Sequence, residues 1–165
     1  MKISNTIHLF PKELKLLIAS FLVVLSMGFY SGLLFVNTTS NFSANGIEEN
    51  YNGNENNEDA SVMKFKKSKR AMLSIIHSHI LSMGMIFFFV GLILVTTNLD
   101  SKLKSFLMIE PFVSVILTFG GIYFLWKGYS FMKYIVIISG TLMTLTYSVS
   151  VYIIFKQLFF SKSKI

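Results

Sequence analysis

The sequence predicts an all-α, polytopic integral membrane protein whose four transmembrane helices form an up-and-down bundle. Of the 165 residues, 53% are hydrophobic and only 14% are charged, and the mean hydropathy is +0.61. Most of the apolar residues gather in four long segments, which are residues 16–36, 71–99, 105–126 and 134–155. Each segment is long enough to cross a hydrocarbon core of about 30 Å, which takes about 20 residues of helix. Within these segments, the only Asp, Glu, Lys or Arg is Glu110.

The composition excludes several classes of protein. There is no cysteine, so the chain has no disulfide, no thiolate zinc or iron–sulfur site and no covalently attached haem. A metal or haem would depend on His, Met, Glu, Asp or Tyr. The net charge is +7, yet the basic residues flank the apolar segments, where they contact lipid headgroups. The expected partner is therefore the lipid bilayer and not nucleic acid.

A basic lead at residues 1–15 precedes the first apolar segment, residues 16–36. This order is typical of a signal peptide or a signal anchor. The apolar segment is longer than the core of a usual signal peptide, and no convincing small-x-small cleavage site follows it. We therefore expect an uncleaved first membrane helix.

Residues 37–70 are polar and rich in asparagine, which predicts a loop. The acidic half comes first, with Glu48, Glu49, Glu55, Glu58 and Asp59, and the basic half follows, with Lys64, Lys66, Lys67, Lys69 and Arg70. We expect the basic half on lipid headgroups, where each charge gains about 1 kcal/mol near an anionic surface. For the acidic half, a solvated loop and a functional loop both stay open.

Three further membrane helices are predicted at residues 71–99, 105–126 and 134–155, and a basic tail follows at residues 156–165. The connections between the helices are short, so consecutive helices are antiparallel neighbours. Because lipid is as apolar as leucine, the helices must associate by close packing and polar contacts. Small and hydroxyl residues should therefore mark the buried faces, namely Gly84, Gly91, Gly120, Gly121, Ser139, Gly140, Thr144 and Ser148.

The orientation is predicted from the positive-inside rule. Basic residues are nearly balanced between the two sides, so the basic lead before the first helix decides, and it places the N-terminus in the cytoplasm. Four spans then place the C-terminus in the cytoplasm as well, with residue 50 outside. We expect a multi-pass protein of the plasma membrane, or of the inner membrane of a bacterium.

His77 and His79 are the most informative residues, because ionisable side chains inside a membrane helix are costly and usually functional. Residues two apart on a helix point about 200° away from each other, so the two histidines cannot bind one metal ion side by side. His79 shares a face with Met83, and this pair could contribute to a copper(I) site, which accepts thioether and imidazole ligands. His77 shares its face with Gly84 and Gly91.

The line of His77, Gly84 and Gly91 resembles the surroundings of b-type haem in membrane four-helix cytochromes, where an axial histidine and packing glycines lie on one helix. The resemblance implies haem b as a cofactor. Those cytochromes supply a second axial histidine from another helix, so here the second ligand would be a methionine or a histidine of another subunit, or the site would be open. Alternatively, the histidines are neutral, hydrogen-bonded residues that orient the bundle, or they serve proton or quinone chemistry.

A divalent metal is another candidate cofactor. His77 and His79 are predicted near the loop end of their helix, on the side of the membrane that also holds the acidic half of the loop. The two histidines cannot bind one metal ion by themselves, because they lie on different faces of the helix. Glu48 could supply the missing ligand. Protonation would compete with the metal, so binding should weaken as the pH falls through about 6 to 7.

Glu110 lies beside Pro111 near the start of the third apolar segment, at the opposite membrane face from the histidines. Lys102 and Lys104 come about a turn and a half earlier and could reach back to the carboxylate. The sequence therefore predicts a structural ion pair for Glu110.

Two motifs, Gly46–Glu55 (GIEENYNGNE) and His77–Met83 (HSHILSM), together resemble a group of small, uncharacterised four-helix bacterial membrane proteins with a GIxxNYxGN-type loop and an HxH helix. The resemblance covers most of the chain and implies no activity, only that the loop and the histidines belong to one unit. Two functions stay open. One is a haem- or metal-linked redox subunit. The other is a non-catalytic subunit that assembles or stabilises a larger complex, with other membrane subunits or as a homo-oligomer.

Overall fold

The computed structural model describes residues 6–55 and 62–160, and every regular element in them is a helix. In chain order these are η1 (Ile7–Leu9), α1 (Lys12–Ser40), α2 (Ala44–Asn52), α3 (Lys69–Val95), α4 (Ser101–Trp126) and α5 (Met132–Phe160). The predicted all-α fold is confirmed. Part of the basic lead, part of the basic tail, and Glu58 and Asp59 of the acidic half lie outside the described residues.

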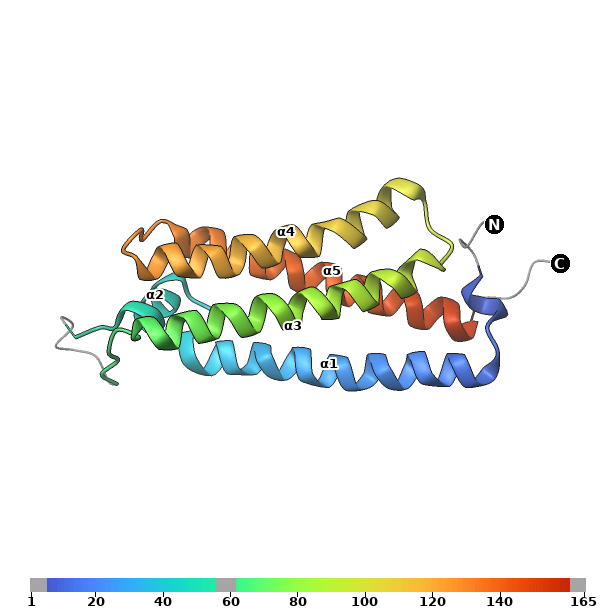
Figure 1. The fold of residues 1–165 in the computed structure, drawn as a ribbon, viewed down its shortest axis with the longest axis horizontal. Coiled ribbons are helices and arrows are strands. Elements are labelled where there is room, and N and C mark those ends of the chain that lie inside the picture. Colours follow the sequence, from blue (N-terminus) through green and yellow to red (C-terminus); the bar gives the residue numbers. More distant parts are fainter. Residues whose placement is uncertain (1–5, 56–61, 161–165) are drawn as a thin grey trace.

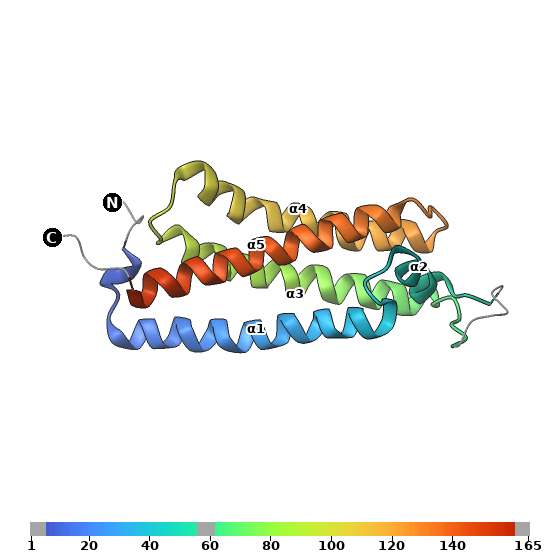
Figure 2. The same cartoon turned by 180° about the vertical axis from the view of Figure 1, so that it is seen from behind.

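Four of the helices, α1, α3, α4 and α5, are long and apolar enough to cross a membrane. They run lengthwise beside one another and reverse direction at each connection (Figure 1). Seen from behind, α5 runs across the bundle with α4 above it and α1 below it (Figure 2). The start of α1 and the end of α5 lie at one end of the bundle and α2 lies at the other, which we call the loop end (Figure 1).

The spans differ from the apolar segments at their ends, and local capping explains the differences. α1 extends to Ser40, where Asn41 adopts a φ of 50°, a left-handed conformation that commonly ends a helix. α3 ends at Val95, because the hydroxyls of Thr96 and Thr97 each donate to a carbonyl of the last turn at 2.7 Å. α4 already begins at Ser101, where the carboxylate of Asp100 caps two backbone N–H groups.

A short helix, α2, lies within the segment that the sequence analysis assigns to a polar loop. Ser43 begins it, since its hydroxyl oxygen accepts a hydrogen bond from the backbone N–H of Gly46 at 2.9 Å. Gly53, with a φ of 84°, ends it. Ile47 and Tyr51 lie one turn apart on the side that packs against the core.

Helices α4 and α5 form the most closely packed pair of the bundle, and α1 is the least buried of the four spans. A Cβ atom on Gly121 would lie 2.9 Å from Cγ2 of Val136, so glycine is what permits this close approach. The hydroxyls of Thr118 and Ser139 are hydrogen-bonded to each other across the pair at 2.7 Å.

The expectation that small and hydroxyl residues mark buried faces is only partly met. Three of the residues named above are buried, namely Gly91, Gly121 and Ser139. The other five are partly exposed, namely Gly84, Gly120, Gly140, Thr144 and Ser148. Hydroxyls on the outer faces bond to carbonyls of their own helix, as Thr144 does to Gly140 at 2.9 Å, and so they need no burial against another helix.

Candidate functional site: the polar segment of helix α3

The half of α3 nearest the loop end carries an unusual set of exposed polar side chains. We call it the polar segment of α3, and it consists of Ser74, His77, Ser78, His79 and Ser82. All five side chains are exposed on a helix that is long and apolar enough to span a membrane. Polar groups at such positions are unfavourable in contact with lipid, so this surface needs an explanation.

Part of the segment satisfies its polar atoms within α3. The Ser78 hydroxyl donates to the carbonyl of Ser74 at 2.7 Å, and the Ser82 hydroxyl donates to the carbonyl of His79 at 3.3 Å. Nδ1 of His79 lies 2.8 Å from the carbonyl oxygen of Ile75, which assigns the proton to Nδ1, because a carbonyl can only accept. These bonds lower the cost of exposure without removing it.

The two histidines occupy different surroundings. The ring of His79 lies beside the ring of Phe119 on α4, with 4.9 Å between their centroids. His77 is exposed and has no hydrogen-bond partner within residues 6–55 and 62–160. The side chains of His77 and Ser74 are therefore the two in the polar segment that form no hydrogen bond within the described residues.

The glycines on the face of His77 leave space beside α3. A Cβ atom built on Gly84 or on Gly91 would meet no other atom within 4 Å, apart from its own helix and neighbours. Gly91 is buried, whereas Gly84 is partly exposed. Another helix or a ligand can therefore approach α3 closely near Gly84. A role of His77, Gly84 and Gly91 in binding haem stays a prediction.

Glu48 belongs to a different set of contacts from the histidines. One carboxylate oxygen accepts from the Ser130 hydroxyl at 2.6 Å, and the other accepts from Nζ of Lys133 at 2.7 Å. Both contacts, with that of Lys133 the stronger, keep the pKa of Glu48 below its ordinary value. Among the described residues, no three His, Cys, Asp or Glu side chains gather closely enough to hold a metal ion.

Met83, the fourth predicted ligand, is partly buried and packs against the hydrophobic core. The structure therefore does not bring His77, His79 and Glu48 together as a cluster. A metal site built from these residues stays a prediction that would require Glu48 to leave Lys133.

Helix α2 and residues 62–68 close the loop end of the bundle. Nδ2 of Asn52 donates to the carbonyl of Leu125 at 2.8 Å, and Nε1 of Trp126 donates to the carbonyl of Lys67 at 2.8 Å. Burial raises the pKa of Tyr51 to about 12. The spacing of Ile47 and Tyr51, four residues apart, is typical of a helix that packs on one side. The surrounding asparagines instead favour a loop, so the sequence did not predict α2.

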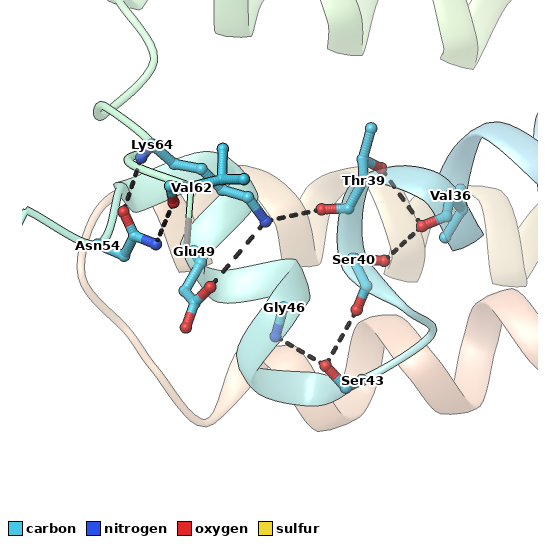
Figure 3. Close-up of polar contacts among 9 residues, drawn as sticks. All are labelled: Val36, Thr39, Ser40, Ser43, Gly46, Glu49, Asn54, Val62 and Lys64. Carbon is cyan, nitrogen blue, oxygen red and sulfur yellow. Dashed lines mark hydrogen bonds and ion pairs between the residues drawn. The ribbon is translucent and has the colours of Figure 1, made fainter. Parts of the chain in front are cut away.

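The acidic and basic halves of the same segment contact each other (Figure 3). Nζ of Lys64 lies 4.0 Å from Oε2 of Glu49 and donates to the carbonyl of Thr39 at 2.9 Å. Asn54 bonds to the backbone of Val62 and Lys64. Lys64 of the basic half thus binds protein rather than only lipid headgroups.

Glu110 does not form the predicted ion pair. Its carboxylate accepts a hydrogen bond from the hydroxyl of Ser114, and Nζ of Lys104 instead donates to the carbonyls of Val95 and Thr97 at 3.2 and 2.6 Å. The lysine caps the end of α3, because the carbonyls there lack partners within the helix. The spacing of Lys104 and Glu110 places the two side chains within reach of each other, but it does not reveal the carbonyls at the end of α3 that compete for the lysine.

Comparison with known proteins identifies the family of the chain but no function. No curated protein and no solved structure matches the chain. A family model described as a transmembrane helical domain, Aq_1264_TM, matches residues 41–165. The matched region contains α2, α3, α4 and α5, and hence the polar segment of α3. The chain therefore belongs to the Aq_1264_TM family of transmembrane helical domains.

Proposed function

We propose that this integral membrane protein is a non-catalytic assembly subunit, which binds a second copy of itself through the exposed face of α3. The observation that carries the proposal is the polar segment of α3, whose five side chains are exposed in a single chain. Membrane helices associate through small and polar residues that pack or hydrogen-bond across the interface. A helix of another chain packed on the face of His77 would shield His77 and Ser74 from lipid.

The residues of this face have the spacing of a helix-packing seam. Ser74, His77, Leu81, Gly84 and Phe88 follow one another at alternating intervals of three and four residues. We call them the α3 stripe. Such spacing keeps side chains on one face and suits left-handed helix pairs. Leu81 and Phe88 are 57% and 50% exposed, so large apolar side chains of the stripe are also uncovered.

A second copy is a suitable occupant because it carries the same polar residues at the same depth. A two-fold axis along the membrane normal would place the α3 stripe of one copy against that of the other. Ser74 would then lie level with Ser74 of the partner subunit, and His77 would lie level with the partner's His77. Hydroxyls and neutral imidazoles both donate and accept hydrogen bonds, so the polar band is complementary to itself.

Cysteine cross-linking tests the contact, and the absence of native cysteine allows single cysteines to be placed freely. Leu81→Cys lies on the α3 stripe. Leu117→Cys is the matched control, because the contact between His79 and Phe119 puts residues 81 and 117 at the same depth and both leucines are exposed. Mild oxidation in native membranes should yield a disulfide-linked dimer for Leu81→Cys and monomer for Leu117→Cys. Monomer for Leu81→Cys, or equal dimer in both variants, would contradict the proposal.

A haem-linked redox role is a second candidate, favoured by the unsatisfied His77 beside the open face at Gly84. In a two-fold dimer, His77 and the partner's His77 lie at one depth, which would supply the second axial histidine that one chain lacks. Absorbance of the purified protein decides this point. A Soret band that disappears in His77→Ala would support the haem role, and a colourless wild-type protein purified from haem-supplied cells would refute it.

A divalent or copper site is tested separately by metal titration at two pH values. Wild type is compared with His77→Ala, His79→Ala and Glu48→Gln. Binding that is lost in the histidine variants and weakens towards acidic pH would support the site. If wild type binds no metal at micromolar concentrations, the histidines have a structural role.

A further inference from the structure

Glu110 is the one acidic side chain within the four apolar segments, and it is only 8% exposed. One carboxylate oxygen, Oε1, accepts the hydrogen bond from Ser114. The other, Oε2, is buried and has no hydrogen-bond partner among the described residues. Burying an ionised carboxylate without a partner is unfavourable, because the charge loses its hydration. Oε2 therefore requires a positive or hydrogen-bond-donating partner.

The position of Glu110 follows from the register of α4 against α5. The contacts of Thr118 with Ser139 and of Gly121 with Val136 fix an antiparallel register, in which residue 110 lies level with residues 146–150. Further buried hydroxyls line the same pair of helices, on α4 at Ser114 and Thr118 and on α5 at Ser139, Thr146 and Ser150. Glu110 thus lies within a seam of buried oxygen atoms, between the levels of Thr146 and Ser150.

The hydroxyls of this seam can still act as acceptors. Thr146 donates to the carbonyl of Leu142 at 2.9 Å, and Ser139 donates to the carbonyl of Ile135 at 2.7 Å. A hydroxyl that uses its hydrogen in this way keeps lone pairs on its oxygen. Carboxylate and hydroxyl oxygens are the ligands that hard monovalent and divalent cations prefer.

Among residues 6–55 and 62–160, the other charged and titratable groups near this depth do not supply the partner. Lys104, on α4 itself, donates to carbonyls at the end of α3. Tyr147 is the titratable residue of α5 at this depth, and its hydroxyl is bonded to Ser26 at 3.0 Å. α3 carries no titratable residue between positions 80 and 95.

We propose that Oε2 of Glu110 binds an exchangeable monovalent cation, either a proton or a sodium ion, within the α4–α5 seam. The site is distinct from the α3 stripe, and it does not depend on the proposed assembly. Binding neutralises the buried carboxylate, and exchange with one side of the membrane would make the seam a point of cation entry.

The experiment uses dicyclohexylcarbodiimide, an apolar reagent that adds to a protonated carboxyl group and rearranges to a stable N-acylurea. The full chain in liposomes is treated and its adducts are located by mass spectrometry. Wild type should carry one adduct, on Glu110. Glu110→Gln should carry none, whereas Glu55→Gln, which alters an exposed carboxylate outside the membrane spans, should react as wild type does.

Two arms identify the cation. If sodium ions slow the labelling at constant pH and choline ions do not, the site binds sodium. If labelling slows only as the pH rises and ignores sodium, the site binds a proton. Circular dichroism and gel filtration verify that each variant is folded. No adduct on folded wild type, an adduct of equal yield in Glu110→Gln, or labelling that responds to neither pH nor sodium would overturn the proposal.

Discussion

The α4–α5 seam and the polar segment of α3 both place polar side chains in the membrane, but they do so in opposite ways. In the seam, Thr118 bonds to Ser139 across the two helices, and both residues are buried. In the polar segment, Ser78 and Ser82 bond only to their own helix and are exposed. The residue type alone therefore does not determine the role of a polar side chain in a membrane helix. What matters is whether another helix covers it.

The largest effect is expected from Gly121, the residue that allows α4 and α5 to approach. Gly121→Leu places a side chain where even a Cβ atom would lie 2.9 Å from Val136. We expect it to lower the free energy of unfolding by about 1–3 kcal/mol or more, the usual cost of overpacking. Unfolding in mixed micelles can be followed by the fluorescence of Trp126, the single tryptophan.

Gly120→Leu is the matched control, because a Cβ atom on Gly120 meets no atom within 4 Å. It should leave the unfolding free energy nearly unchanged. Equal losses from the two substitutions would show that the seam is not closely packed at Gly121, and the comparison between the two regions would fail.

The next effect concerns the docking of α2 at the loop end. Glu48 has a lowered pKa in the folded protein because Lys133 and Ser130 bind its carboxylate. Because docking lowers the pKa, the contact stabilises the docked state at pH values above the pKa of the free side chain. This contribution is lost as the pH falls through the pKa of Glu48 in the folded protein. α2 should therefore stay docked at neutral pH and detach in acid, below the range of an ordinary glutamate.

The emission of Trp126 as a function of pH measures this detachment, since α2 and the following segment bond to Leu125 and Trp126. Glu48→Gln should already show the detached emission at neutral pH. A variant with the same pH profile as wild type would mean that the bond to Lys133 does not hold α2.

A smaller effect is expected where α1 meets α5. Tyr147 is fully buried and bonds to Ser26, whereas Tyr30 is 43% exposed and bonds to Ser148. Tyr147→Phe should lower the unfolding free energy by about 0.6 kcal/mol, the average for such bonds in membranes, and Tyr30→Phe by less. Unfolding in mixed micelles measures both variants. A larger loss of unfolding free energy in Tyr30→Phe than in Tyr147→Phe would contradict the expected effect of burial.

The smallest effect on stability is expected in the polar segment of α3. The Ser78 hydroxyl bonds to a carbonyl of its own helix, so Ser78→Ala should change the unfolding free energy of the monomer by no more than about 0.5 kcal/mol. A large loss in the monomer would show that the polar segment stabilises the fold of one chain.

The four spans were predictable because lipid requires long apolar helices, and the sequence displays them directly. α2 was not, because nine residues with a single buried isoleucine give a weak signal among asparagines. The burial of Glu110 depends on how α4 rotates about its axis, which spacing alone cannot define. Which faces of α3 around His77 and His79 are covered depends on tertiary packing, which the sequence pattern does not define.

The central claim is that the α3 stripe lies against a second copy, and a distance between copies tests it most directly. Spin labels are attached to Leu81→Cys or to Leu117→Cys in liposomes, and double electron–electron resonance measures the separation of the two labels in a dimer. The account predicts a short, well-defined distance at residue 81 and a longer one at residue 117. The absence of a dipolar signal at residue 81, or a shorter distance at residue 117, would contradict it.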